Sequence, residues 1–196
     1  MSRRAAAAAA IVVFALVAAW VLFIGLPRWY SARSTQAVAE AASTTPAPTA
    51  AVRKITATLF YVAEDGMSLV AVQREVPFGA SVAEQARAIV AAQLAAADAP
   101  HVSAIPAGVT LRDVFITERG DAFVDVSGDI SARHPGGSLD EIFTVYTLVN
   151  ALTVNLPAIA RVQILIDGKE ADTLAGHVDL RHPLAKSLEW VVHDTQ

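Results

Sequence analysis

The segment Gly136–Leu180 constrains the fold of this chain most strongly, because it predicts a helix, a strand and a tight turn in succession. Apolar side chains recur at helical spacing at Leu139, Ile142, Phe143, Tyr146, Val149, Leu152 and Leu156. Ser138 and Glu141 match a capping box, in which each side chain bonds a backbone amide at the helix start, and Pro157 ends the helix. Ile159–Ile166 then predicts a strand that Asp167-Gly168 turns back.

The first thirty residues predict a membrane anchor. Ala5–Leu26 has no charged side chain and, at about 1.5 Å per residue, is long enough to cross a bilayer core of about 30 Å. Arg3 and Arg4 precede this run, so the positive-inside rule places the N-terminus in the cytoplasm and the rest outside. The alternative is a cleavable signal peptide, for which Ala37-Val38-Ala39 is a candidate cleavage motif.

Residues 31–53 predict a linker, and the remainder predicts an acidic domain. The linker is rich in Ala, Ser, Thr and Pro and lacks the large apolar residues that offset the entropy of ordering. The whole chain has a net charge of −4, and only four of its 15 basic residues precede Arg53. An acidic domain repels phosphate backbones, so we expect no nucleic-acid partner. The chain has no cysteine, which excludes disulfides, zinc–thiolate sites and a lipid-modified N-terminal Cys.

The domain itself is predicted at residues 54–184, followed by a tail at 185–196. Strands are expected at Ile55–Ala63 and Ser68–Val76, around a turn at Glu64-Asp65-Gly66. Ser81 and Glu84 form a second capping box ahead of a helix at Val82–Ala97. A hairpin follows at Thr110–Glu118 and Ala122–Val126, with inward-facing side chains expected at Leu111, Val114, Ile116 and Phe123. This order predicts an α+β fold in which two helices pack on one face of a mainly antiparallel sheet.

Seven segments, in their order and spacing, resemble a GerMN domain. They are Phe60–Pro77, Glu84–Val90, Asp121–Gly128, Gly136–Ser138, Thr144–Thr153, Val162–Lys169 and Leu174–Leu180. The resemblance implies a non-enzymatic domain of the kind found in sporulation and germination lipoproteins and other bacterial envelope proteins. The chain departs from that pattern because it has one such domain and no lipobox.

The sequence predicts no catalytic, cofactor-binding or metal-binding residue. Asp125 and Asp129 lie at calcium-loop spacing, but Ile130 replaces the required Gly and Gly136 replaces the twelfth-position Glu. His177 and His182 lie near Asp179 in sequence without the i, i+4 spacing of metal ligands. No nucleophile-elbow or phosphate-loop motif occurs. We therefore expect these side chains to have surface or hydrogen-bonding roles.

Two apolar features suggest burial or binding. The helix that begins at Ser138 carries extra apolar side chains at Val145, Leu148 and Val154, which indicates either deep burial or an interface. The tail segment Leu184–Val192 is also apolar. It is expected to pack on a sheet edge, to cover an exposed strand or to offer a partner site, in that order.

Together these features predict a single-pass membrane protein with a non-catalytic extracytoplasmic domain. The expected role is an interaction module in envelope or cell-wall assembly, with another envelope protein, peptidoglycan or a copy of itself as partner. The first alternative is a cell-wall hydrolase, which requires Asp125, Asp129, Glu141 and His177 to converge on one cleft. The second is an accessory domain that senses a ligand.

Overall fold

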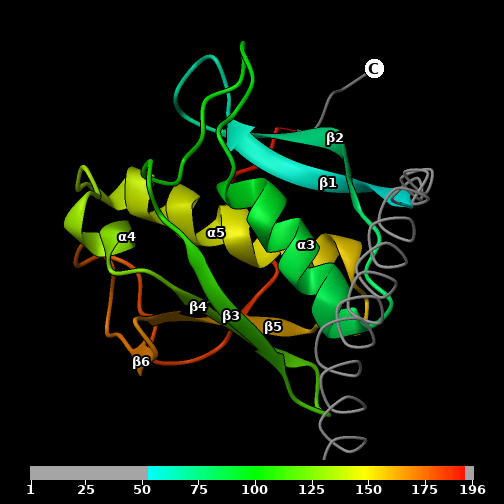
Figure 1. The fold of residues 1–196 in the computed structure, drawn as a ribbon. Coiled ribbons are helices and arrows are strands. Elements are labelled where there is room, and N and C mark those ends of the chain that lie inside the picture. The colour runs from blue at the N-terminus through cyan, green and yellow to red at the C-terminus, as the bar shows by residue number, and fades with distance from the viewer. Residues whose placement is uncertain (1–52, 193–196) are drawn as a thin grey trace, which may run out of the picture. The chain divides into compact units, whose positions relative to one another are not determined.

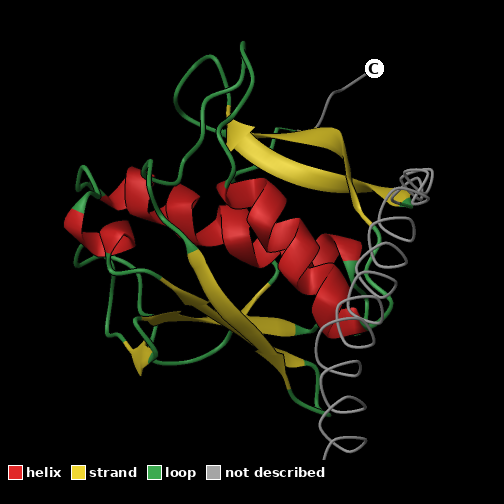
Figure 2. Ribbon diagram, in the orientation of Figure 1, coloured by secondary structure: helices red, strands yellow, loops and turns green. Residues whose placement is uncertain are grey.

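The computed structural model describes residues 53–192, and their fold is α+β as predicted (Figures 1 and 2). Two strands come first, β1 (Lys54–Val62) and β2 (Leu69–Pro77), followed by helix α3 (Val82–Leu94). The second half contains β3 (Leu111–Ile116), β4 (Asp121–Val126), α4 (Asp129–Ala132), α5 (Ser138–Asn155), β5 (Arg161–Ile166), β6 (Lys169–Glu170) and β7 (Leu184–Ala185). No helix among these residues is long and apolar enough to cross a membrane, and the predicted anchor Ala5–Leu26 lies outside them.

The strands form two sheets rather than the single sheet that the sequence predicted. β1 and β2 pair as a separate antiparallel hairpin, while β3, β4, β5, β6 and β7 form a mixed sheet in which β4 and β5 are parallel. Figure 1 shows α3 and α5 between the hairpin and the mixed sheet. The parallel pair arises because α5 connects β4 to β5, and a strand–helix–strand crossover brings its two strands side by side in the same direction.

The position of α5 between two sheets explains its extra apolar side chains. Val145 and Leu148 are completely buried, as are Val149 and Leu152 from the predicted stripe. The helix contacts β1 on one side and β5 on the other, so a single apolar stripe would not cover both contacts. Of the two alternatives, burial is confirmed.

The two predicted capping boxes have different outcomes. At α3 the Ser81 hydroxyl accepts the Glu84 amide at 3.2 Å and the Glu84 carboxylate accepts the Ser81 amide at 3.3 Å, as predicted. At α5 the prediction is wrong, because the N-cap is Gly137 and Ser138 is already the first helical residue. Gly137 has a φ of 89°, which favours glycine. Glu141 points into the protein instead of back to the helix start.

Replacement of each serine by alanine separates these two environments. We expect Ser81→Ala to lower the free energy of unfolding by about 1 kcal/mol, because the first turn of α3 loses its acceptor. Ser138→Ala, the matched control, is expected to change it by less than about 0.5 kcal/mol, since no side-chain bond caps α5. Urea denaturation of both variants checks the difference, and equal losses would contradict the assignment of the caps.

Phe123 lies on the opposite face of the mixed sheet from the one predicted. Ala122 and Val124 are completely buried, so strand alternation points Phe123 away from the helices. Phe123 is registered opposite Phe115, which is 53% exposed.

The apolar tail packs on the edge of β2, which was the first of the three alternatives. The Leu69 amide donates to the Trp190 carbonyl at 2.7 Å, and the Val192 amide donates to the Leu69 carbonyl at 2.8 Å. Asn150 of α5 holds the same segment by accepting the Ser187 amide and donating to its carbonyl. The Trp190 ring also meets the edge of Phe143, at 6.5 Å between ring centroids.

Candidate functional site

Asp125 joins β4 to the turn between β5 and β6. Its side chain is buried, and its Oδ1 accepts the Gly168 amide at 2.7 Å. Its Oδ2 accepts Arg112 Nε at 3.1 Å. Asp167 and Gly168 both have positive φ, as the Asp-Gly signal predicted, and this turn exposes the Gly168 amide to the carboxylate. Asp125 therefore has a structural role.

Asp129 is the first residue of α4, and its carboxylate also has hydrogen-bond partners. Its carboxylate accepts Arg133 Nε at 2.9 Å and the Ser127 hydroxyl at 3.3 Å. Asp125 instead points to the Gly168 amide, so the two carboxylates do not share a ligand position. Within residues 53–192 no group of three or more His, Asp or Glu side chains is placed to hold a metal ion.

Glu141 is completely buried, and its carboxylate binds the backbone of the segment 172–180. Oε1 accepts the Leu174 amide and Oε2 accepts the His177 amide, each at 2.8 Å. Burial raises the pKa of Glu141, but hydrogen bonds from the Ala175, His177, Leu174 and Val178 amides lower it by more, so its net shift is downward. A carboxylate held ionised by backbone donors is a poor general acid. Glu141 instead fastens a segment that has no strand partner.

The histidine and aspartate near Leu180 do not form a catalytic pair. His177 contacts Glu141 through its backbone amide rather than its imidazole. Asp179 accepts both Arg181 Nε at 2.9 Å and Arg181 Nη2 at 2.7 Å, and this guanidinium lowers the pKa of Asp179 far below its usual range. No hydrogen bond joins either carboxylate oxygen to His177 or His182 among the described residues. The small cavity at His177, of about 230 Å³, therefore contains no hydrogen-bonded carboxylate–imidazole pair.

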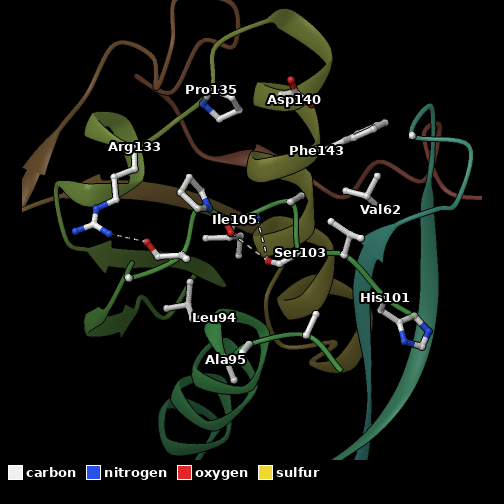
Figure 3. Close-up of a pocket in the computed structure, with 18 residues that line it drawn as sticks. Val62, Leu94, Ala95, His101, Ser103, Ile105, Arg133, Pro135, Asp140 and Phe143 are labelled. Carbon is white, nitrogen blue, oxygen red and sulfur yellow. Dashed lines mark hydrogen bonds between the residues drawn. The ribbon is translucent and has the colours of Figure 1, made fainter. Parts of the chain in front are cut away.

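An open groove of about 950 Å³ lies in the described part of the chain (Figure 3). Its apolar lining comes from Val62 of β1, Leu94 of α3, Phe143 of α5 and Ile105. The loop at 95–108 supplies most of the remaining wall. Figure 3 shows Arg133 and His101 at opposite ends of the groove.

Two polar side chains that line this groove, those of Ser103 and Arg133, are bonded within the local fold. The Ser103 hydroxyl accepts the Ile105 amide at 3.1 Å and donates to its carbonyl at 3.3 Å. Arg133 bonds Asp129 and donates to the Ala107 carbonyl at 3.3 Å. Nucleophilic catalysis requires a hydroxyl in contact with a base, and Ser103 contacts only backbone. The Ser103 hydroxyl is therefore not arranged as a nucleophile.

Sequence reasoning missed a set of buried polar side chains that hold the chain together. Most bond a backbone segment from another element, and Thr144 also contacts His134, whose Nε2 lies 3.2 Å from the hydroxyl. The bonded members are Gln85, Gln93, Asp125, Glu141, Thr144, Asn150 and Gln163. The Thr147 hydroxyl has no partner among the described residues. For the members on α3 and α5, the sequence signal is a polar residue among apolar ones at helical spacing.

Replacement of Asp125 tests its structural role. We expect Asp125→Ala to lower the free energy of unfolding by about 2 to 3 kcal/mol, because a buried carboxylate that accepts an amide and a guanidinium is lost. Chemical denaturation measures this change. Asp129→Ala is the control, since its half-exposed pair with Arg133 contributes less than about 1 kcal/mol. A larger loss at Asp129 would contradict this assignment.

Solved structures with the same fold include two of a sporulation protein and one of a protein provisionally named a lipoprotein. The first GerMN domain of the sporulation protein GerM from Bacillus subtilis is 19% identical, with a TM-score of 0.52 over 67% of this chain and 97% of that one. The tandem GerMN domains of the same protein are 21% identical, with a TM-score of 0.50 over 69% of this chain and 45% of that one. A Clostridium perfringens protein provisionally named a lipoprotein is 18% identical, with a TM-score of 0.50 over 69% and 90% of the two chains.

Family membership follows from the sequence match. No curated protein sequence matches the chain. The family model described as Germane, sporulation and spore germination, matches residues 58–172, which include every strand and helix from within β1 to β6. The order of these elements agrees with the resemblance seen in the sequence. This chain therefore belongs to the Germane family, the GerMN-type domains of sporulation and spore germination proteins.

Proposed function

We propose that this chain is a membrane-anchored interaction module of the bacterial envelope, which holds a partner outside the cytoplasmic membrane without catalysing a reaction. The observation that carries the proposal is that the candidate catalytic carboxylates are all hydrogen-bonded to other groups of the fold. Asp125 and Glu141 bond backbone amides, and Asp129 bonds Arg133, so none is left to act on a substrate. The hydrolase alternative required these groups to converge on one cleft.

The location is supported by the sequence outside the domain and by the relatives. Ala5–Leu26 has the length and composition of a membrane anchor, and the linker that follows is long enough to hold a domain away from the bilayer. A structural neighbour provisionally named a lipoprotein is consistent with the same side of the membrane. The partner class that fits is another envelope protein or peptidoglycan.

Cross-linking in native membranes tests this function. We expect the full-length chain to form a discrete cross-linked product with an envelope protein, or to sediment with isolated cell wall. A chain of residues 1–52 alone is the matched control, because it keeps the predicted anchor and linker and lacks the domain. If the full-length chain gives neither product nor sedimentation beyond that control, the proposal is wrong.

A further inference from the structure

His134 connects three segments at one wall of the groove. Its Nδ1 accepts the Gly136 amide at 3.0 Å, and its Nε2 lies 3.2 Å from the Thr144 hydroxyl of α5. That hydroxyl donates to the Ala104 carbonyl at 2.6 Å. Pro135 and Ala104 both line the groove. The ring therefore joins the turn before α5, the helix itself and the loop that follows α3.

These bonds define the protonation state of the ring. A backbone amide is a donor, so Nδ1 carries no hydrogen where it accepts the Gly136 amide. The single hydrogen of the Thr144 hydroxyl is used at the Ala104 carbonyl, so this hydroxyl accepts from Nε2. The neutral imidazole with its hydrogen on Nε2 satisfies every bond. The imidazolium has a hydrogen on both nitrogens, so it places two donors against each other at Gly136.

The Gly136 bond holds a turn that the backbone alone does not define. Pro135 has no amide hydrogen, and the two glycines that follow have positive φ, of 87° at Gly136 and 89° at Gly137. Glycine adopts many other conformations equally well, so a bond from outside the backbone is needed to select this one. Gly137 is the N-cap of α5. Loss of the bond therefore frees both the start of α5 and the groove wall at Pro135.

The charged side chains around the ring do not reverse its preference for the neutral form. In α4, Asp129 bonds Arg133, whose guanidinium also donates to the loop. In α5, the Glu141 carboxylate bonds another segment, and the Asp140 carboxylate is exposed, so water and salt screen its attraction to a charged ring. The loop at 103–108 has no ionisable side chain. The positive end of the α5 dipole also disfavours an imidazolium beside it.

His101, at the opposite end of the groove, lacks this selectivity. Its Nδ1 lies 3.3 Å from the Asp98 carbonyl, which accepts a hydrogen from a neutral or a protonated ring. The preference at His134 therefore comes from the donor that faces its Nδ1, and not from a place beside the groove.

We propose that His134 is a pH-sensitive switch in the wall of the groove. At neutral pH the ring holds the turn before α5 against the loop that follows α3. A free histidine side chain takes up its proton between about pH 8 and 5. At His134 this proton releases the Gly136 amide and frees the turn that carries Pro135. The switch belongs to the fold and does not depend on a partner, so its failure and the failure of the proposed function are separate results.

Thermal unfolding of the full-length chain at pH 7.5 and pH 5.5 tests the switch. His134→Asn supplies a side-chain oxygen that accepts the amide two positions later, as in an Asx turn, and takes up no proton. We expect the melting temperature to fall by about 3 to 5 °C more in the wild type than in His134→Asn. The reason is that the unfolded chain binds the proton while the intact turn excludes it, so stability is present above the histidine range and is lost as pH falls through it.

His177→Asn is the matched control, because the His177 side chain is exposed and its bond to Glu141 is made by the backbone amide. This variant is expected to keep the wild-type loss of melting temperature. The interval from pH 7.5 to pH 5.5 also lies above the pKa of Glu141, which is lowered from its ordinary value of 4.5 by backbone hydrogen bonds that outweigh its burial. Titration of that carboxylate therefore does not contribute to the difference.

NMR of the ring nitrogens in the wild-type chain gives a second readout that needs no variant. At pH 7.5 we expect Nδ1 of His134 to carry no hydrogen and Nε2 to carry one. On acidification, the amide signals of Gly136 and Gly137 are expected to shift with the same midpoint as the ring. This common midpoint shows that protonation and release of the turn are one event.

Several results would overturn the inference. They are a hydrogen on Nδ1 at pH 7.5, an equal fall of melting temperature in the wild type and His134→Asn, a loss of the pH effect in His177→Asn, and a ring that titrates while the Gly136 signal stays unchanged. If His134→Asn does not fold, the NMR titration of the wild type decides between the two outcomes on its own.

Discussion

Replacement of Glu141 by alanine is expected to lower the free energy of unfolding by about 3 to 5 kcal/mol. The carboxylate accepts the Leu174 and His177 amides at 2.8 Å from a completely buried position. Its removal leaves those amides without an acceptor and leaves a cavity beneath the segment 172–180. Urea denaturation measures the loss, and amide exchange at Leu174 and His177 shows whether it is local.

Glu141→Gln separates charge from shape. The amide keeps one acceptor oxygen, so we expect about half the loss of stability. The folded pKa of Glu141 lies below its ordinary value of 4.5, so its contribution to stability is present above that value and is lost as pH falls through the folded pKa. Glu141→Gln is therefore expected to lack this part of the acid dependence. An unchanged acid-unfolding profile in Glu141→Gln would contradict this role.

Replacement of Gln93 by leucine is expected to lower the free energy of unfolding by about 3 kcal/mol. The side chain is completely buried and satisfies both the amide and the carbonyl of Phe60. A leucine of similar size leaves two buried backbone groups unpaired, each of which costs about 1 to 3 kcal/mol. Chemical denaturation measures the stability, and faster exchange of the Phe60 amide locates the effect.

Gln73→Leu provides the control for Gln93→Leu. Gln73 makes one exposed bond, from Nε2 to the Thr58 hydroxyl at 3.0 Å, and its loss is expected to change stability by less than about 0.5 kcal/mol. If Gln93→Leu is as mild as this control, the β1 edge does not depend on the buried amide. A loss of unfolding free energy that is several times larger in Gln93→Leu than in Gln73→Leu shows that Gln93 stabilises the edge of β1 at Phe60.

The elements that depend on neighbouring residues were predictable from the sequence. The hairpin of β1 and β2, the capped helix α3 and the Asp167-Gly168 turn agree with expectation, because each depends on strand alternation, a cap or a positive-φ turn within a few residues. The burial of α5 followed from its apolar side chains on more than one face. These signals are local and largely independent of the rest of the fold.

The contacts between distant segments were not predictable. A Ser-x-x-Glu motif occurs at both helices, yet only Glu84 returns to its cap, while Glu141 bonds a segment more than thirty positions later. The motif has the same residues in both places, so only the surrounding fold decides which partner the carboxylate meets. The division into two sheets has the same cause, because Gln93 and Asn155 close the β1 edge from separate helices.

For the candidate site, expectations from the sequence covered single side chains but not the surfaces that they form. The sequence predicted surface or hydrogen-bonding roles for Asp125, Asp129 and His177. The carboxylates of Asp125 and Asp129 have hydrogen-bond partners, whereas His177 bonds Glu141 through its backbone amide. The groove had no sequence signal, since it arises from the packing of the 95–108 loop near β1, α3 and α5. Surfaces of this kind depend on tertiary structure alone.

The most direct test of whether this protein binds without reacting is to incubate the purified full-length chain with isolated cell wall, and separately with membranes that are then cross-linked. We expect a discrete partner adduct, or wall retention, together with no release of soluble wall fragments above the control of residues 1–52. Release of such fragments that is abolished by Asp125→Asn or Glu141→Gln would contradict a non-catalytic interaction module and would identify a hydrolase.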